Sequence, residues 1–202
     1  MDQELDDVYV LNVNPGTPGS GEELPMSWGH IDVSGVEPIG REGHSAVQYG
    51  SRIIYFGGYT EKGFTNELLI LDTTTNAWQI PAVSGVKPAG REGHTALVYN
   101  NRMYVFGGFT NGGCLNDLYI LDLKTMSWEI GITSGITPSV REDHSAILRG
   151  HEMLFVGGCN FGKGKCFCDL NILNLENLVW REEKTKGIVD DLVVTPREDH
   201  TM

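Results

Sequence analysis

Four histidines and four glutamates recur at regular intervals and could together bind a metal ion. In each repeat a glutamate stands two residues before a histidine, in the pairs Glu42 and His44, Glu92 and His94, Glu142 and His144, and Glu198 and His200. Imidazole and carboxylate groups are good ligands for several divalent cations. If these segments converge around one axis, they could form a metal-binding ring.

The same recurrence also has a structural explanation, because a binding site on a ring seldom needs identical groups in every repeat. We expect the arginine and histidine of the Arg-Glu-Gly/Asp-His segments to bond to backbone carbonyls or to the glutamate of a neighbouring unit. Tryptophans should pack between units, and glycine pairs should permit close backbone packing. Trp28 has the corresponding place in the first, incomplete unit. On this interpretation no metal or other cofactor is needed, and the structural residues are Arg41, His44, Gly57, Gly58, Trp78, Arg91, His94, Gly107, Gly108, Trp128, Arg141, His144, Gly157, Gly158 and Trp180.

The cysteines are the second group with chemical potential. The chain has four, at Cys114, Cys159, Cys166 and Cys168. Four thiolates could bind zinc, but the usual C-x2-C spacing is missing, and Cys166-Phe167-Cys168 is a C-x-C pair that constrains chelation strongly. A redox-sensitive pair is another alternative. We expect ordinary reduced thiols, as is typical of an intracellular protein.

A repeat of 50 residues organises all of these residues. Residues 41–90 and 91–140 align without a gap and share 23 identical positions, which chance cannot produce. Within 91–140, alternating residues from 94 to 99 indicate a strand, and Asn100-Asn101 indicates a tight turn. Further strands are expected at 102–106, at 117–121 and at about 128–132, and no segment has a convincing helical period. Each unit therefore predicts four antiparallel strands, which is the arrangement of a propeller blade.

In its repeated motifs the sequence resembles the Kelch-repeat family. The resemblance rests on the Gly-Gly pair that ends the second strand, on the tryptophan that opens the fourth strand and on a tyrosine between them. Tyr9 and Tyr119 match that tyrosine, whereas Leu69 and Asn171 replace it in the other units. The resemblance implies an all-β fold of Kelch-type β-propeller blades.

The chain divides into about three and a half four-stranded blades, a partial propeller. Residues 1–40 supply the third and fourth strands of a blade with a long loop between them, and 197–202 begin a further repeat. The complete repeats are 41–90, 91–140 and 141–196, the last with insertions. Either the chain is a piece of a longer propeller, or two copies complete one ring, because closed propellers need at least four blades.

Variable loops on one face are the best candidates for contacts with a partner. Alternating strand directions place the loops after the second and fourth strands on the same face, and the insertions of the third complete unit fall there. Exposed aromatic side chains beside lysines suit a protein-binding surface. The candidate contact residues are Tyr59, Glu61, Lys62, Phe64, Phe109, Asn111, Asn160, Phe161, Lys163, Lys165 and Phe167, of which Phe161 and Phe167 have no counterpart in the other units.

Charge and hydropathy exclude several other classes of partner. The net charge of -12 disfavours binding to nucleic acid and to anionic membranes. No apolar stretch is long enough to span a bilayer, and the first residues lack the pattern of a signal peptide, so we expect a cytoplasmic protein.

The sequence therefore predicts a scaffold or adaptor that binds a partner protein, and not an enzyme. The alternative is a metal-dependent enzyme of Kelch fold, related to the oxidases or specifier proteins of that family, with a site partly in blades outside this chain. No Ser-His-Asp arrangement, phosphate loop or paired carboxylate site supports catalysis.

Overall fold

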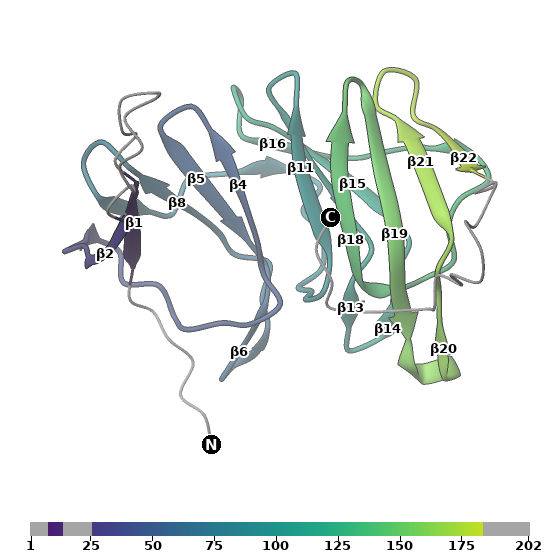
Figure 1. Ribbon diagram of the computed structural model, residues 1–202, viewed down its shortest axis with the longest axis horizontal. Coiled ribbons are helices and arrows are strands. Elements are labelled where there is room, and N and C mark those ends of the chain that lie inside the picture. The colour runs from purple at the N-terminus through teal and green to yellow at the C-terminus, as the bar shows by residue number, and fades with distance from the viewer. Residues whose placement is uncertain (1–7, 14–25, 184–202) are drawn as a thin grey trace, which may run out of the picture.

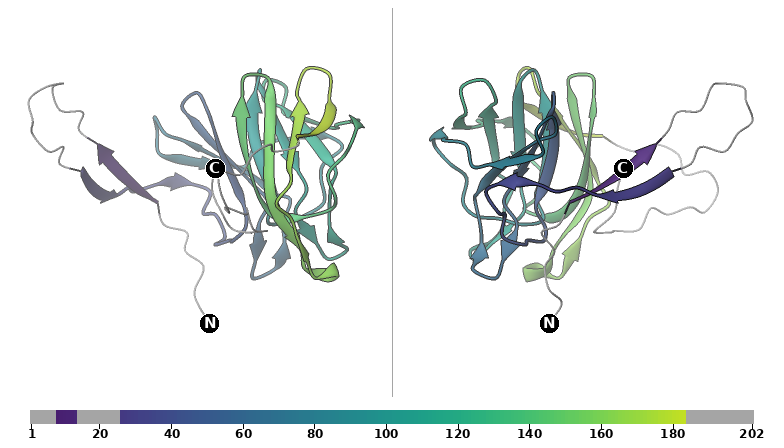
Figure 2. Two further views of the ribbon diagram at one scale, coloured as in Figure 1. Left: turned by 45° about the vertical axis from the view of Figure 1, so that its right-hand side comes forward. Right: turned by 90° about the vertical axis from the view of Figure 1, so that its left-hand side faces the viewer.

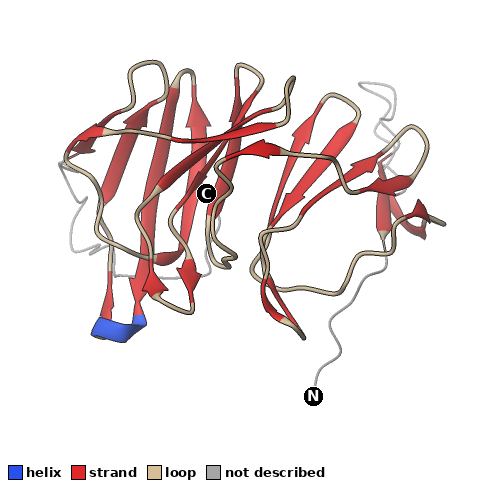
Figure 3. Cartoon of the chain, turned by 180° about the vertical axis from the view of Figure 1, so that it is seen from behind, coloured by secondary structure: helices blue, strands red, loops and turns tan. Residues whose placement is uncertain are grey.

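A computed structural model describes residues 8–13 and 26–183 of the chain. The described part is all-β, as predicted, and its helical content is one short 3-10 turn, η1 (Phe161–Lys163) (Figure 3). None of the helical segments among the described residues could cross a membrane. The predicted start of a further repeat at 197–202 and most of the long loop in the first unit lie outside the described residues.

Three similar sheets make up most of the molecule (Figure 1). The first sheet contains, from its outer to its inner edge, β3 (Ser34–Gly35), β9 (Ala77–Gln79), β8 (Leu68–Asp72), β5 (Arg52–Phe56) and β4 (Ser45–Tyr49). The second contains β10 (Ser84–Gly85), β16 (Ser127–Ile130), β15 (Leu118–Asp122), β12 (Arg102–Phe106) and β11 (Thr95–Tyr99). The third contains β17 (Ser134–Gly135), β22 (Val179–Glu183), β21 (Leu170–Asn174), β19 (Glu152–Asn160) and β18 (Glu142–Arg149). Four strands of each sheet are antiparallel, as expected for Kelch blades.

Shorter elements complete the fold. At the N-terminal end, β1 (Tyr9–Val13) and β2 (Met26–His30) pair alone as a half-sheet, which extends away from the three sheets in Figure 2. Two small hairpins follow the glycine pairs, and in the third sheet β19 itself continues into the equivalent hairpin. Their strands are β6 (Tyr59–Thr60), β7 (Gly63–Phe64), β13 (Phe109–Thr110), β14 (Gly113–Cys114) and β20 (Lys165–Cys166).

The two-residue outer strands were not predicted. The sequence indicates a chain break at Ser134-Gly135, but there and at the two equivalent positions the chain forms a parallel strand on the tryptophan-bearing strand of the following unit. In the second sheet the amide of Val86 donates to the carbonyl of Trp128 at 3.0 Å. A connection between two sheets therefore also covers the outer edge of the second one, which would otherwise expose unpaired backbone groups.

The hydrophobic core lies between the sheets. Alternation along β12 turns Met103 and Val105 toward the first sheet, and Tyr104 and Phe106 toward the third. Because both faces of this central sheet are covered, β12 is apolar from Met103 to Phe106 and β15 is apolar from Leu118 to Leu121. Trp128 packs on Phe56 of the preceding sheet, with ring centroids 5.1 Å apart. Such packing requires that each sheet has a neighbour.

Trp28 departs from the expected packing. Trp78, Trp128 and Trp180 are buried, whereas Trp28 on β2 is 70% exposed. Trp128 and Trp180 pack on Phe56 and Phe106 of the sheets that precede their own. Among the described residues, no sheet lies before the half-sheet that could cover Trp28 in this way. The expectation that all four tryptophans pack between blades is therefore wrong for Trp28.

Candidate protein-binding face

Three hairpins project from the same end of the sheets, opposite the turns that join the first and second strands (Figure 1). They occupy equivalent places in the three units. The residue pair next to the sheet is Tyr59 and Phe64 in the first hairpin, Phe109 and Cys114 in the second, and Cys159 and Cys166 in the third. We call this end of the molecule the hairpin face.

The connections between sheets reach the same face. The side-chain amide of Asn66, after the first hairpin, donates to the carbonyl of Pro88 at 3.0 Å, and that of Asn116 donates to the carbonyl of Pro138 at 2.9 Å. The loops after the second strands and the connections after the fourth strands therefore contact each other, as their shared face predicts.

An aromatic cluster covers part of the hairpin face. The rings of Tyr59 and Phe64 meet edge to face with centroids 5.0 Å apart, and Phe64 contacts Phe109 of the next hairpin at 5.7 Å. Tyr59 is exposed, and Phe64 and Phe109 are half-buried. The cluster combines rigid apolar area with access to solvent, which suits a surface that binds another protein.

Nine of the eleven candidate contact residues have exposed or half-buried positions. Phe161 at the start of η1 is 56% exposed, the largest exposure of any aromatic residue in the three hairpins. Besides the three aromatic residues of the cluster, the accessible candidates are Glu61, Lys62, Asn111, Lys163 and Lys165, which are all exposed.

The other two candidates are buried and support the third hairpin from inside. Phe167 is only 9% exposed, and its ring lies 4.0 Å from the guanidinium carbon of Arg141. Asn160 accepts a hydrogen bond from the backbone amide of Lys163 at 3.1 Å and so caps η1. The two side chains stabilise the hairpin, so their assignment to the contact surface is corrected. An inserted aromatic residue has no equivalent in the other units, and its residue type alone does not show whether its side chain points into the solvent or into the protein.

The repeated arginines hold the base of the hairpin face together. Arg91 is buried and donates from Nη1 to the carbonyl of Gly107 at 2.9 Å and to Oδ1 of Asp117 at 2.6 Å. Arg141 binds Gly157 and Asp169 in the same way. The expected bonds to carbonyls are therefore present, but the carboxylate comes from the arginine's own unit and not from a neighbouring glutamate.

Two of the repeated histidines, His94 and His144, join their unit to the preceding sheet. Nε2 of His94 lies 2.8 Å from the hydroxyl of Ser45 in the preceding sheet, and Nε2 of His144 lies 2.9 Å from that of Thr95. Burial, with a smaller contribution from Arg91, lowers the pKa of His94 to about 3. His94 is therefore neutral in the folded protein. Among the described residues, no three histidines, cysteines or carboxylates are placed to hold a metal ion.

The burial of His94 predicts a pH-dependent stability. The folded state binds a proton less readily than the unfolded chain, in which the pKa has its ordinary value of 6.5. The stabilisation is therefore complete above about pH 6.5 and decreases as the pH falls toward 3. Between pH 7 and pH 5, His94 should lower the free energy of unfolding by about 2 kcal/mol. Urea unfolding at pH 7, 6 and 5 should show a smaller pH dependence for His94→Gln than for the wild type.

The control for this prediction is His151→Gln, because His151 is exposed. This variant should keep the pH dependence of the wild type. Equal pH dependence for the wild type and His94→Gln would contradict the assignment of a neutral, buried His94.

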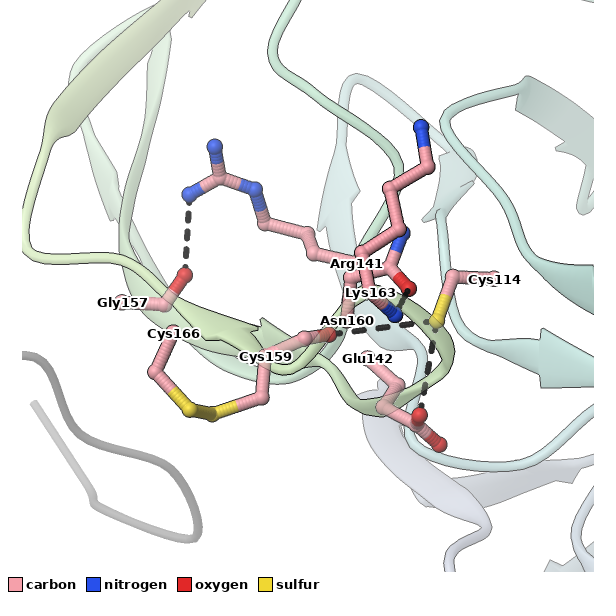
Figure 4. Close-up of a disulfide and its surroundings, with 8 residues drawn as sticks. All are labelled: Cys114, Arg141, Glu142, Gly157, Cys159, Asn160, Lys163 and Cys166. Atoms are coloured by element: carbon pink, nitrogen blue, oxygen red, sulfur yellow. Dashed lines mark hydrogen bonds between the residues drawn. A yellow bond between two sulfur atoms is a disulfide. The ribbon is translucent and has the colours of Figure 1, made fainter.

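Two of the cysteines form a disulfide, contrary to the expectation of four reduced thiols. Cys159 and Cys166 face each other across the third hairpin and are bonded, with Cα atoms 4.0 Å apart (Figure 4). The amide of Phe167 donates to the carbonyl of Gly158, so the two cysteines form a non-hydrogen-bonded pair, the arrangement that brings cross-strand side chains closest. The C-x-C pair is not the bonded one.

The remaining two thiols are free. Cys168 is exposed, and Cys114 donates to the carboxylate of Glu142 with a sulfur–oxygen distance of 3.4 Å. Burial and this contact with Glu142 raise the pKa of Cys114 to about 11. Cys114 is therefore an unreactive thiol at neutral pH.

An acidic cavity lies beside the hairpins. Its volume is about 220 Å³, and its lining consists of Glu42, Gly43, Glu92, Gly93, Glu142 and Asp143. In the three Arg-Glu-Gly/Asp-His segments that the structure describes, the third residue has a left-handed backbone. The amide of Gly93 donates to the carbonyl of Gly43 at 2.9 Å, and the amide of Asp143 donates to the carbonyl of Gly93 at 2.8 Å. This ladder brings the glutamates together. The recurrence of these glutamates in the sequence indicates a structural or metal-binding role and does not predict a cavity at the candidate binding face.

The fold and the hairpin face define a class of protein, a set of Kelch-type β-propeller blades that presents variable hairpins on one face. The comparison with protein families agrees with this class. Residues 2–202 match the family described as the KLHDC2/KLHL20/DRC7 Kelch-repeats domain, and the chain belongs to this Kelch-repeat family.

Individual relatives match shorter stretches. Kelch domain-containing protein 3 of Homo sapiens is 40% identical over 55 residues, which are 26% of this chain and 14% of that protein. Acyl-CoA-binding domain-containing protein 4 of Arabidopsis thaliana is 32% identical over 79 residues, which are 39% of this chain and 10% of that protein. The matched stretches thus span no more than about a seventh of these relatives' own length.

Proposed function

We propose that this chain is a protein-interaction module that binds a partner protein through its hairpin face, as a scaffold or adaptor does. The observation that supports this proposal most strongly is the exposure of Tyr59 and Phe161 on hairpins anchored to rigid sheets. Arg41 and Arg141 tie the base of the first and third hairpins to carbonyls and carboxylates, so the exposed side chains are presented without further ordering. A preordered surface loses less entropy when it binds.

The residues of the hairpin face are sufficient for binding a protein, whereas catalysis would need further groups. A protein partner needs only complementary apolar and polar area, and the hairpin face supplies both kinds. We place the module in the cytoplasm, in keeping with the acidic and weakly hydrophobic composition. In that compartment the disulfide between Cys159 and Cys166 would be exposed to cellular thiols.

Removing the two exposed rings should weaken capture of the partner without unfolding the protein. We expect the double variant Tyr59→Ser, Phe161→Ser to retain less than a tenth of the captured partner, because buried aromatic anchors contribute most of the binding energy at such interfaces. The measurement is affinity capture from a cell extract, quantified by mass spectrometry, with thermal unfolding measured in parallel.

The matched control removes apolar area of a similar kind from another surface. Leu148 and Val179 are 40% and 38% exposed and lie beside the turns at the opposite end of the third sheet. The variant Leu148→Ser, Val179→Ser should capture the same proteins as the wild type. If Tyr59→Ser, Phe161→Ser also captures the same proteins in the same amounts, the hairpin face is not the binding surface.

A further inference from the structure

The acidic cavity and the aromatic cluster are parts of one surface. The backbone of Glu42 exchanges hydrogen bonds with that of Tyr59, at 3.0 and 2.9 Å, and Glu92 exchanges bonds with Phe109 at 3.1 and 2.8 Å. Each of these glutamates therefore stands directly beside the first aromatic residue of a hairpin. A carboxylate and an aromatic ring therefore stand side by side in each of the first two complete units.

The charge in the cavity is of one sign. Its lining contains three glutamates, one aspartate and two glycines. The side chains of Arg41 and Arg91, which adjoin Glu42 and Glu92 in the sequence, turn away to Glu67 and Asp117 of their own units. Burial, followed by the charges of Glu42 and Glu142, raises the pKa of Glu92. A positive group that entered the cavity would relieve this repulsion between carboxylates.

The lysines of the hairpin face occupy a different zone. Lys62 lies in the turn of the first hairpin, and Lys163 lies in η1 at the tip of the third. The glutamates pair with the opposite end of the hairpins, next to the sheets. Lys165, at the start of β20, places its ammonium group 5.0 Å from the centre of the Phe167 ring in the third hairpin. A basic side chain of a partner is therefore attracted to the glutamates at the base of the first and second hairpins.

We infer that the hairpin face binds a segment of its partner in which a lysine or arginine stands next to an apolar residue. The cation enters the cavity between Glu42 and Glu92, and the apolar side chain packs on Tyr59, Phe64 and Phe109. This inference rests on the proposed function and specifies the chemistry of the partner.

The size and chemistry of the surface fit a single basic side chain. The volume of about 220 Å³ is below the ~300–1,000 Å³ of typical pockets for whole small molecules, so one side-chain end group suits it better than a complete ligand. Carboxylates in a concave site also concentrate their field and select cations. The neighbouring aromatic faces attract the same cations.

The test is selection from a random library of phage-displayed dodecapeptides on the immobilised chain. We expect the selected peptides to be enriched in Lys or Arg adjacent to an apolar residue. A synthetic peptide of the consensus sequence is then titrated by fluorescence anisotropy. The variant Glu42→Gln, Glu92→Gln, which keeps the shape of both side chains, should bind this peptide at least ten-fold more weakly than the wild type.

The matched control is Glu37→Gln, Glu129→Gln, which changes the net charge equally at two exposed positions away from the cavity. It should bind the peptide within two-fold of the wild type. An equal loss in both double variants would mean that only the overall negative charge attracts the peptide, and this would overturn the inference.

The outcomes separate the inference from the proposed function. Selected peptides that bind through Tyr59 and Phe161 but lack basic residues would overturn the inference and leave the binding face in place. Failure to select any peptide would count against both. Binding of CaCl2 that depends on Glu42 and Glu92, in the absence of peptide binding, would assign the cavity to a metal ion and overturn the inference.

Discussion

Replacing Arg91 with alanine is expected to lower the free energy of unfolding by about 3 kcal/mol, because it leaves buried polar groups without their partner. The guanidinium bonds to both carboxylate oxygens of Asp117, at 2.6 and 3.0 Å, and to the carbonyls of Gly107 and Ala89. The Asp117 side chain keeps 36% of its surface exposed. The expected loss of free energy of unfolding is therefore at the lower end of the range measured when one partner of a buried ion pair is removed. Urea unfolding at pH 7 measures the difference.

Arg102 is the matched control for this prediction because it lies in the same repeat unit and also pairs with a carboxylate. Its ion pair with Glu129 is exposed on both sides, with a nitrogen–oxygen distance of 3.3 Å. Arg102→Ala should cost less than about 1 kcal/mol, as is usual for exposed ion pairs. Arg91→Lys should fall between the two alanine variants, because an ammonium group cannot replace the planar two-pronged contact. Equal losses for Arg91→Ala and Arg102→Ala would show that the buried network does not stabilise the blade.

A single methyl group at Gly85 is expected to destabilise the second sheet by about 2–3 kcal/mol. Gly85 lies on the short outer strand β10, at a φ of 78°, a value that side-chain-bearing residues rarely adopt. A Cβ there would also collide with the carbonyl oxygen of Trp128. To avoid the collision, β10 must move away and give up its backbone bond from Val86 to Trp128.

Gly50→Ala separates the two causes of this effect. Gly50 has a φ of 61°, but a Cβ at this position would have no atom within 4 Å. Gly50→Ala should therefore lower the free energy of unfolding by about 1 kcal/mol, which is the cost of the left-handed backbone alone. Thermal and urea unfolding of both variants give the comparison. If Gly85→Ala is no more destabilising than Gly50→Ala, the outer strand is not held as tightly as its contacts indicate.

The repeat pattern was sufficient to predict the architecture. Strand positions in the second unit agree with the structure within about two residues, because the alternation from Arg102 to Phe106 and the turn at Asn100-Asn101 are local features of the chain. The sequence also indicated that the loops after the second and fourth strands share a face, since this follows from strand direction alone. The internal repeat made both deductions possible from one chain.

The candidate site was predictable only in part. Residue type and position marked Tyr59 and Phe161 as surface contacts, but the same signals marked Phe167, whose ring covers Arg141. Type and spacing are alike for the two inserted phenylalanines, and the direction of a side chain in a hairpin depends on how that hairpin pairs. The outer strands at Ser-Gly were missed for a related reason, because their partners are tryptophans about 43–45 residues further along the chain.

The sequence by itself determined the blade, since alternation, turn residues and the spacing of 50 act within one unit. Tertiary structure alone decided three further features: the pairing of Cys159 with Cys166, the position of His94 between two sheets, and the meeting of Glu42 with Glu92 beside the aromatic cluster. Each of these depends on the angle and distance at which strands or whole sheets pack, and that geometry results from many weak contacts summed across an interface, which no local pattern records.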